Sequence, residues 1–326
     1  MKIDVHSHFV VEECSQRLSS RHDGRNIVQE ASGQDSGKWN VELFKTLRDK
    51  LSDVPTRLKD MDQGGIDIQV LSPPPYMLYY WADIETGAAL SKMQNDRISE
   101  ICRQYPSRFI GMGTVPLQDV ALANQELERM ARVLNLRGVI ISSNVNGKDL
   151  DDKALYPFFE KAESLGVLIF IHPHDTAAAQ RMQNYYLTNL LGNPLDTAIA
   201  GSRIILSGLL AKLPRLKIFL AHGGGHLPYV MGRIHQGYIV RPECRKEISR
   251  PPWDYFRSLY FDTITHDRST LEYLIHVSGS GQVLMGTDYP YDMAERDPVG
   301  FVSNLAIPEA DKKKILGENL RGILGV

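Results

Sequence analysis

Two histidines one residue apart, His6 and His8, follow the short run Lys2–Val5 at the start of the sequence. The run predicts a strand, and side chains two residues apart in a strand point to the same face. Two imidazoles on one face can bind a single metal ion. The alternative is a pair of unrelated surface histidines at a chain end, because short motifs often arise by chance. The metal interpretation therefore requires further ligands elsewhere in the chain.

Three later apolar runs end in residues that could supply those ligands, namely His172, His222 and Asp288. Each of these runs predicts a strand. Histidine and carboxylate ligands without cysteine suit Zn²⁺, with Mn²⁺, Fe²⁺ or Co²⁺ as alternatives. We predict a single-ion site with one position open for water, whose protein ligands are His6, His8, His172 and Asp288.

His222 is predicted to act beside the metal rather than on it. A metal-bound water has a pKa of about 7, and a histidine that hydrogen-bonds this water can serve as general acid and base. In this interpretation Asp288 belongs to the catalytic machinery as well as to the ligand set. The alternatives are that His222 is a further nitrogen ligand or binds a second ion. One metal is favoured, because the run that ends in residues 140–144 carries no lysine that could bridge two ions.

Eight apolar runs, most of them separated by a helical pattern, must position these residues. The predicted strands are residues 2–5, 66–71, 109–116, 136–142, 167–172, 217–222, 259–263 and 283–288. The predicted helices are residues 53–63, 85–104, 119–133, 154–165, 178–212 (two or more), 227–238, 269–277 and 309–316. This alternation predicts an α/β fold, a (β/α)8 TIM barrel formed by residues 1–326 as one domain. The carboxyl ends of all strands then meet on one face and bring the five residues together.

An open doubly wound sheet is the alternative fold. No Gly-x-Gly-x-x-Gly follows the first strand, which disfavours a dinucleotide-binding fold. The polar stretch 11–56 is too long for an ordinary loop and predicts an insertion or lid after strand one. Within its last residues, Asp53 is a predicted N-cap and Pro55 lies in the first turn of a helix that Gly64 and Gly65 end.

Composition narrows the class of protein. The chain has 326 residues, 43% hydrophobic, and a formal net charge of −2, which gives no reason to expect nucleic acid or a membrane as partner. No apolar run approaches the roughly 20 residues that span a bilayer, and no secretory signal is evident. The three widely spaced cysteines, Cys14, Cys102 and Cys244, are typical of reduced thiols, so we expect a cytoplasmic protein.

Four segments resemble the motifs of the amidohydrolase superfamily, closest to its branch of α-amino-β-carboxymuconate-ε-semialdehyde decarboxylase. They are Asp4–Phe9, His172–Asp175, His222–Gly225 and Gly286–Pro290, with further matches at 61–67, 115–119 and 180–182. The resemblance runs from Lys2 to the C-terminal helix. It implies a metal-dependent barrel that decarboxylates an unsaturated or aromatic acid without oxidation. It also implies Zn²⁺ at the four ligands named above and His222 as acid/base.

The resemblance further implies a homodimer with a shared site. Arg233, eleven residues past His222, matches an arginine that reaches into a neighbouring subunit and binds the substrate carboxylate; the alternative is a surface charge on a helix. A second substrate-binding arginine of the family has no clean match near Phe44–Lys45. His226 also departs from the pattern and is either a substrate contact or a helix-start histidine without a role.

Three other residues near the predicted site have proposed supporting roles. His174 and Asp175 follow a ligand and are candidates for substrate contacts or for orienting that ligand. Asp262, at the end of the seventh strand, could orient a ligand or serve only the fold.

We therefore expect a carboxy-lyase whose partner is a small carboxylic acid. A proton delivered through metal-bound water and His222 reaches the carbon that bears the carboxylate, and CO₂ leaves. The alternative is a hydrolase of a lactone, amide or ester that uses the same residues, with metal hydroxide as the nucleophile. A barrel that merely binds metal or a partner is a third hypothesis from a different class.

Overall fold

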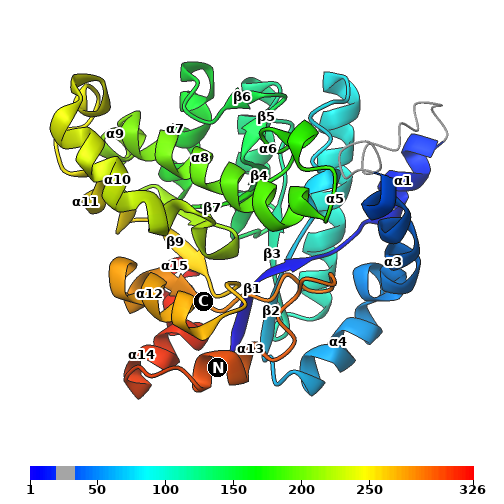
Figure 1. Ribbon diagram of the computed structural model, residues 1–326. Helices are drawn as coiled ribbons and strands as arrows, with labels where there is room; N and C mark the ends of the chain where they lie inside the picture. Colours follow the sequence, from blue (N-terminus) through cyan, green and yellow to red (C-terminus); the bar gives the residue numbers. More distant parts are fainter. Residues whose placement is uncertain (20–33) are drawn as a thin grey trace.

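An eight-stranded parallel sheet forms the centre of the protein (Figure 1). The computed structural model describes residues 1–19 and 34–326, and within these the sheet order is β1-β2-β3-β4-β7-β8-β9-β10. The strands are β1 Ile3–His8, β2 Ile68–Ser72, β3 Phe109–Gly113, β4 Gly138–Ser142, β7 Leu168–His172, β8 Lys217–Leu220, β9 Tyr260–Asp262 and β10 Val283–Leu284. The barrel is closed by backbone hydrogen bonds between β1 and the chain just after β10. In one of them Val5 N donates to Met285 O at 2.9 Å. The predicted (β/α)8 barrel is confirmed.

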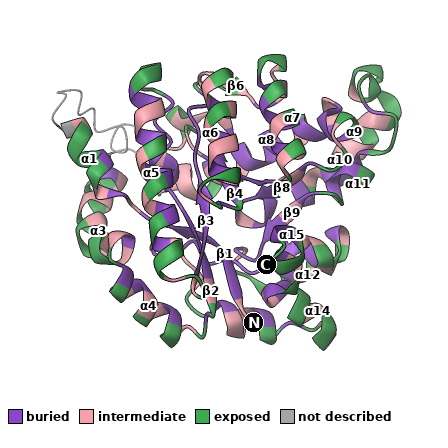
Figure 2. Cartoon of the chain, turned by 180° about the vertical axis from the view of Figure 1, so that it is seen from behind, coloured by how far each residue is buried: buried purple, intermediate pink, exposed green. Residues whose placement is uncertain are grey.

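Helices surround the barrel, and Figure 2 shows buried strands inside partly exposed helices. After β2 come α5 Ile84–Gln104, α6 Val120–Arg132, α7 Tyr156–Leu165, α8 Asn193–Leu206, α9 Leu209–Lys212, α10 Leu227–Val240, α11 Pro252–Phe256, α12 Arg268–Ser278, α13 Pro298–Ser303, α14 Glu309–Lys313 and α15 Asn319–Leu324. The predicted helices 85–104, 119–133, 154–165, 227–238 and 269–277 are confirmed to within two residues at each end. The predicted C-terminal helix is instead broken into pieces that continue to Leu324.

Four strands end earlier than predicted, among them β3 at Gly113 and β9 at Asp262. For the other two, β8 and β10, the reason lies in the turns that follow them. β8 ends at Leu220 and β10 at Leu284, so His222 and Asp288 lie in loops beyond the sheet. Both residues have a positive φ, 55° and 63°, which no strand residue adopts. The backbone N–H of His222 donates to the Asp262 carboxylate instead of to a neighbouring strand.

The segment after β1 contains α1 Glu12–Ser19 and α3 Gln34–Ser52 (Figure 1). Arg48 Nε donates to Glu12 Oε1 at 2.9 Å and ties these two helices together. Residues 20–33 of the predicted insertion lie outside the described residues. The next helix, α4 Val54–Gln63, has the predicted N-cap, because Asp53 accepts a hydrogen bond from Thr56 N at 2.8 Å.

A short antiparallel hairpin after β4 was not expected from the sequence. It pairs β5 Asn144–Val145 with β6 Lys148–Asp149. The turn residues Asn146 and Gly147 have φ of 52° and 79°, the backbone that Asn-Gly pairs favour in two-residue hairpins. This dipeptide was the signal in the sequence that could have predicted the hairpin.

The barrel interior is packed with aromatic rings directly below its carboxyl-end face. Phe170 and Phe219 stack at 4.5 Å between ring centroids, and His6 lies edge-on to Phe170 at 4.8 Å. The three cysteines lie in described segments and are free thiols. No helix within the described ranges combines the length and the apolar character that crossing a bilayer requires.

Candidate metal centre

Five of the predicted site residues lie together at the carboxyl ends of the strands. The Nε2 atom of His6 is 3.2 Å from Nε2 of His8 and 3.4 Å from Asp288 Oδ1. His8 Nε2 is 3.3 Å from the same oxygen. The His172 ring lies 5.1 Å from the rings of both His6 and His8, between centroids. Potential ligand atoms of His6, His172, His222 and Asp288 all lie within 4.8 Å of one another.

Each of the three ligand candidates on β1 and β7 is oriented through its Nδ1 atom. Nδ1 of His8 faces Pro73 O at 3.3 Å, and Nδ1 of His172 faces Pro173 O at 3.0 Å. A carbonyl oxygen only accepts, so these contacts assign the ring proton to Nδ1 and leave a lone pair on Nε2. His6 Nδ1 is 2.7 Å from Asp262 Oδ2, a carboxylate of the kind that commonly orients metal-bound histidines.

The distances among these atoms fit a shared divalent ion. Ligand atoms that surround a metal ion tetrahedrally, each about 2.0–2.1 Å from the ion, lie roughly 3.4 Å from one another. The separations among His6 Nε2, His8 Nε2 and Asp288 Oδ1, 3.2–3.4 Å, are close to this value. Within the described residues, the buried atoms His172 Nε2 and Asp288 Oδ1 have no hydrogen-bond partner. Unpartnered buried polar atoms are costly, and a cation between them would remove that cost.

Burial and mutual charge shift the pKa values of the cluster. Burial opposes protonation of His6, but Asp288 and Asp262 together raise its pKa to about 10. Burial, and then the neighbouring imidazoles, lower the pKa of His172 well below its usual range. Although burial alone would raise the pKa of Asp288, His6 and the other histidines hold it well below its usual range. The site therefore contains an anionic carboxylate facing imidazoles that compete for one positive charge.

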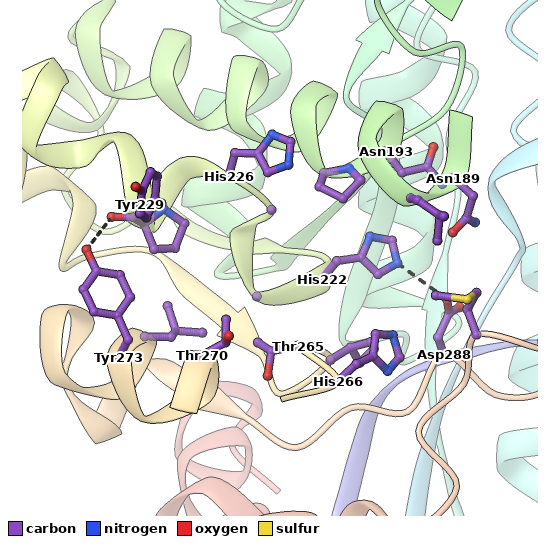
Figure 3. Close-up of a pocket in the computed structure, with 18 of the residues that line it drawn as sticks. Asn189, Asn193, His222, His226, Tyr229, Thr265, His266, Thr270, Tyr273 and Asp288 are labelled. Carbon is purple, nitrogen blue, oxygen red and sulfur yellow. Dashed lines mark hydrogen bonds and ion pairs between the residues drawn. The ribbon is translucent and has the colours of Figure 1, made fainter. Parts of the chain in front are cut away.

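His222 and His8 approach different oxygens of the same carboxylate. His8 Nε2 contacts Oδ1 of Asp288, whereas His222 Nε2 lies 3.5 Å from Oδ2 (Figure 3). If metal ligands were chosen only by the distances among their ligand atoms, His222 rather than His8 would join His6, His172 and Asp288. The orientation argues otherwise, because His8 shares with His6 the oxygen that has no hydrogen-bond partner.

Asp262 has a larger role at the site than the sequence indicated. Besides His6 Nδ1, its carboxylate accepts the backbone N–H of His222 at 2.9 Å, of Gly223 at 2.7 Å and of Ile264 at 3.1 Å. One buried side chain therefore orients His6 and also fixes the turn that presents His222.

Two cavities meet at His222 and Asp288. The larger, the histidine cavity, has a volume of about 670 Å³, and Figure 3 shows its wall. The smaller, the tyrosine cavity, has a volume of about 410 Å³. The histidine cavity is defined by His226, His266, Tyr229 and Tyr273, and the tyrosine cavity by Phe44, Tyr76, Tyr186 and Tyr291. A planar ligand held at the cluster could extend into either cavity.

The aromatic wall of the tyrosine cavity combines a residue of α3 with residues that follow β2 and β10. Phe44 of α3 lies edge-on to Tyr76 at 5.6 Å and to Tyr291 at 6.2 Å between ring centroids. Tyr291 in turn lies 5.6 Å from the His8 ring. The sequence did not single out Tyr291; its position three residues beyond Asp288, after Pro290, was the available signal.

The three predicted substrate-binding residues have different positions. His174 lines the tyrosine cavity, with Nε2 3.7 Å from Asp175 Oδ1, and burial lowers its pKa. His226 lies at the start of α10 and lines the histidine cavity, and partial burial lowers its pKa. Arg233 is exposed on α10 and is not among the described residues that line either cavity.

Comparisons of the sequence with known proteins match a family profile and a decarboxylase over nearly the whole chain. The sequence profile of the amidohydrolase family matches residues 3–326. A 2-amino-3-carboxymuconate-6-semialdehyde decarboxylase from Dictyostelium discoideum is 34% identical, over 100% of this chain and 92% of its own length.

Two solved structures superpose over almost the whole chain. A 5-carboxyvanillate decarboxylase from Sphingomonas paucimobilis has a TM-score of 0.88 and 29% identity, and the match covers 100% of this chain and 99% of that one. A dihydroxybenzoic acid decarboxylase from Polaromonas, with bound manganese and 2-nitroresorcinol as inhibitor, has a TM-score of 0.84 and 27% identity. That match covers 99% of this chain and 96% of the other.

Proposed function

Because the chain belongs to the amidohydrolase family, we propose that it is a metal-dependent carboxy-lyase that removes CO₂ from an unsaturated or aromatic carboxylic acid without oxidation. The observation that carries this proposal is the position of His222, which contacts Asp288 Oδ2 beside the cluster at the junction of two cavities. The relatives and structural neighbours reported above are named decarboxylases, which favours this reaction over hydrolysis by the same residues.

The proposed ligands are His6, His8, His172 and Asp288. A bound divalent ion supplies positive charge that holds the carboxylate of the substrate or a neighbouring oxygen. Zn²⁺ suits this nitrogen and oxygen set, and Mn²⁺ is the alternative that the Polaromonas structure supports. Asp262 keeps the His6 ring turned so that Nε2 faces the other ligand atoms.

The chemistry then depends on His222. Its Nε2 proton, held toward Asp288 Oδ2, is transferred to the carbon that bears the carboxylate, and a new C–H bond forms. That carbon becomes tetrahedral and the conjugated system loses one electron pair. The bond to the carboxylate breaks, its electron pair returns to the conjugated system, and CO₂ leaves. Carboxylate plus one proton thus gives the product and CO₂, without an oxidant or a water molecule.

Substrate binding is assigned to residues around the cluster. The ring of the acid lies against the aromatic wall of the tyrosine cavity, within reach of His174, and His226 contacts the part that enters the histidine cavity. We also propose that the protein is a homodimer in which Arg233 of α10 reaches the neighbouring site. This role accounts for an arginine that is exposed within one chain and yet lies on the helix that begins at a cavity wall.

The remaining parts of the proposal concern the insertion and the location of the protein. Residues 11–56, which include α1 and α3, serve as a lid within a single barrel domain, because Phe44 of α3 forms part of a cavity wall. Three free thiols suit the reduced cytoplasm.

A substrate panel tests the reaction. The purified protein, reconstituted separately with Zn²⁺ and Mn²⁺, is incubated with hydroxybenzoic acids, 5-carboxyvanillate and 2-amino-3-carboxymuconate-6-semialdehyde, and with a set of lactones. CO₂ release from at least one acid, with deuterium from D₂O at the vacated carbon, is expected. Opening of lactones without CO₂ from any acid would replace the lyase assignment with the hydrolase. Metal binding without turnover of either set would favour a non-catalytic barrel.

A further inference from the structure

Arg57, on the second turn of α4, is a charged side chain in the interior of the protein. Its exposed fraction is 0%. Among the described residues, its Nε has no hydrogen-bond partner, and the carboxylates of Asp4 and Asp60 favour its charge without accepting a hydrogen bond from it. Although burial lowers its pKa to about 10, the group stays protonated at neutral pH. A buried cation without a direct counter-ion is unfavourable and calls for a compensating role.

The guanidinium holds the end of β1, which carries His8. One Nη atom donates to the backbone carbonyl of His8 itself and to Lys50 O at 3.1 Å. The other donates to Ser7 Oγ at 3.3 Å. Arg57 therefore fixes the backbone from which one proposed ligand projects.

The same side chain also supports the loop that carries Asp288. The guanidinium carbon lies 4.6 Å from the centroid of the Tyr289 ring, the residue after this proposed ligand. Tyr289 O accepts the backbone N–H of His8 at 2.9 Å, so the two ligand-bearing segments are joined where Arg57 contacts both. Cation–π contacts of this kind strengthen when they are removed from water.

A buried chain of hydrogen bonds, the relay, also links Arg57 to Thr287 on the loop that carries Asp288. Arg57 donates to Gln69 Oε1 at 2.7 Å, and Gln69 Nε2 donates to Asp4 at 2.8 Å. The Asp4 carboxylate accepts from Thr287 N at 3.0 Å and from Thr287 Oγ1 at 2.7 Å. The path runs from α4 through β2 and β1 to the residue before Asp288.

We propose that Arg57 is a positioning residue of the metal centre, which holds His8 and Asp288 at the spacing that one ion requires. The inference rests on the proposed metal site. It adds that a helix outside the barrel sets the geometry of two ligands that come from opposite ends of the chain. A purely structural Arg57 would lower the stability of the fold and leave the metal affinity of the folded protein unchanged.

The test compares metal affinity with stability in matched variants. Arg57→Gln removes the charge and most of the donors, Arg57→Lys keeps only the charge, and Arg129→Gln breaks a surface ion-pair group on α6 as a control. Mn²⁺ binding is followed by loss of the free-ion electron paramagnetic resonance signal, at temperatures where circular dichroism shows each variant folded. Supporting contacts behind ligands typically change affinity about 10–100-fold, and we expect this loss in Arg57→Gln.

We expect Arg57→Lys to lose less Mn²⁺ affinity than Arg57→Gln. Arg129→Gln should keep the wild-type Mn²⁺ affinity even if its melting temperature falls. Wild-type Mn²⁺ affinity in folded Arg57→Gln, or full rescue by lysine, would overturn the positioning role. If neither Arg57 variant folds, Gln69→Met cuts the relay and keeps the guanidinium. Weakened Mn²⁺ binding by this variant supports the proposal, and unchanged binding overturns it. A wild-type protein that binds no Mn²⁺ or Zn²⁺ would instead refute the proposed metal site itself.

Discussion

The Nε2 atoms of His6 and His8 lie 3.2 Å apart, although the other nitrogen of each ring is already paired, with Asp262 and with Pro73 O. Two ring nitrogens that face each other at this distance repel unless a cation lies at or between them. In the metal-free protein a proton on His6 meets this need, and the carboxylates of Asp288 and Asp262 favour that proton by raising the pKa of His6 to about 10. A divalent ion would satisfy both rings and Asp288 at once.

Metal binding is therefore expected to stabilise the fold. A ligand at a hundredfold excess over its Kd adds about 2.7 kcal/mol to the free energy of unfolding. Zn²⁺ or Mn²⁺ added to chelator-treated protein should raise the melting temperature, measured by differential scanning calorimetry. His8→Ala should lose most of this rise, while His276→Ala, an exposed histidine on α12, should keep it. An unchanged melting temperature in the wild-type protein would contradict the site.

The affinity for metal should increase with pH. The folded metal-free protein keeps a proton on His6 up to about pH 10, above the ordinary value of 6.5. Metal must displace this proton, so the apparent Kd should fall about tenfold per pH unit as pH rises through the neutral range. The same proton stabilises the metal-free fold below pH 6.5, and this contribution is lost as pH rises through 10. Calorimetric titration with Mn²⁺ in buffers of different ionisation enthalpy should report about one proton released per ion. No proton release would contradict a protonated His6 in the metal-free site.

Replacement of His222 should separate catalysis from metal binding. His222→Ala removes the proton donor and should lower kcat about 10²–10⁴-fold. Its metal content, measured by atomic absorption, should equal that of the wild type, because its Nε2 faces the oxygen of Asp288 that the ligand histidines do not share. His8→Ala is the matched comparison and should lose metal. If the two variants exchanged these outcomes, His222 would be the ligand.

Subunit mixing tests the role of Arg233. Arg233→Ala and His222→Ala homodimers should each be nearly inactive. If each site combines His222 of one chain with Arg233 of the other, random re-pairing should restore about a quarter of wild-type activity, since one site of each heterodimer is complete. Activity is measured after mild dissociation and reassociation. No recovery in a mixture shown by native mass spectrometry to contain heterodimers would exclude a shared site.

The aromatic wall should affect binding more than turnover. Phe44→Ala removes one side of the tyrosine cavity and should raise KM for an aromatic acid about 2–10-fold with little change in kcat, in line with the value of an aromatic contact. Trp39→Ala on the same helix is the control, because Trp39 is 66% exposed and is not among the described residues that line the cavity. An equal effect of both substitutions would indicate that α3 acts only through the fold.

The sequence predicted the parts of the fold that depend on local pattern. Alternating apolar runs and helices indicated the barrel, and strand ends in a barrel share a face, so the convergence of His6, His172 and Asp288 followed from their positions alone. The sequence also placed Asp53 at a helix start, because a cap is a property of neighbouring residues.

Tertiary contacts limited what the sequence could show. Periodicity marks which face of a helix is buried but not what lies opposite, so the sequence did not single out Arg57 among the charged residues of α4. Three of the four contacts made by Asp262 are with residues far away in sequence, His6, His222 and Gly223. The aromatic wall likewise joins Phe44 to Tyr291 through loops whose paths no local rule defines.

The closure of the barrel between β1 and the chain after β10 has a consequence for biosynthesis. His8 ends the first strand and Asp288 follows the last one in a loop, and the backbone N–H of His8 donates to Tyr289 O. During translation β1 therefore remains without this neighbour until the segment after β10 has left the ribosome. Contacts between such distant residues form slowly and leave an open strand edge exposed in the meantime. If His8 and Asp288 both bind the ion as proposed, the metal site is complete only after that edge has closed, and the ion would bind fully folded chains in preference to partly folded ones.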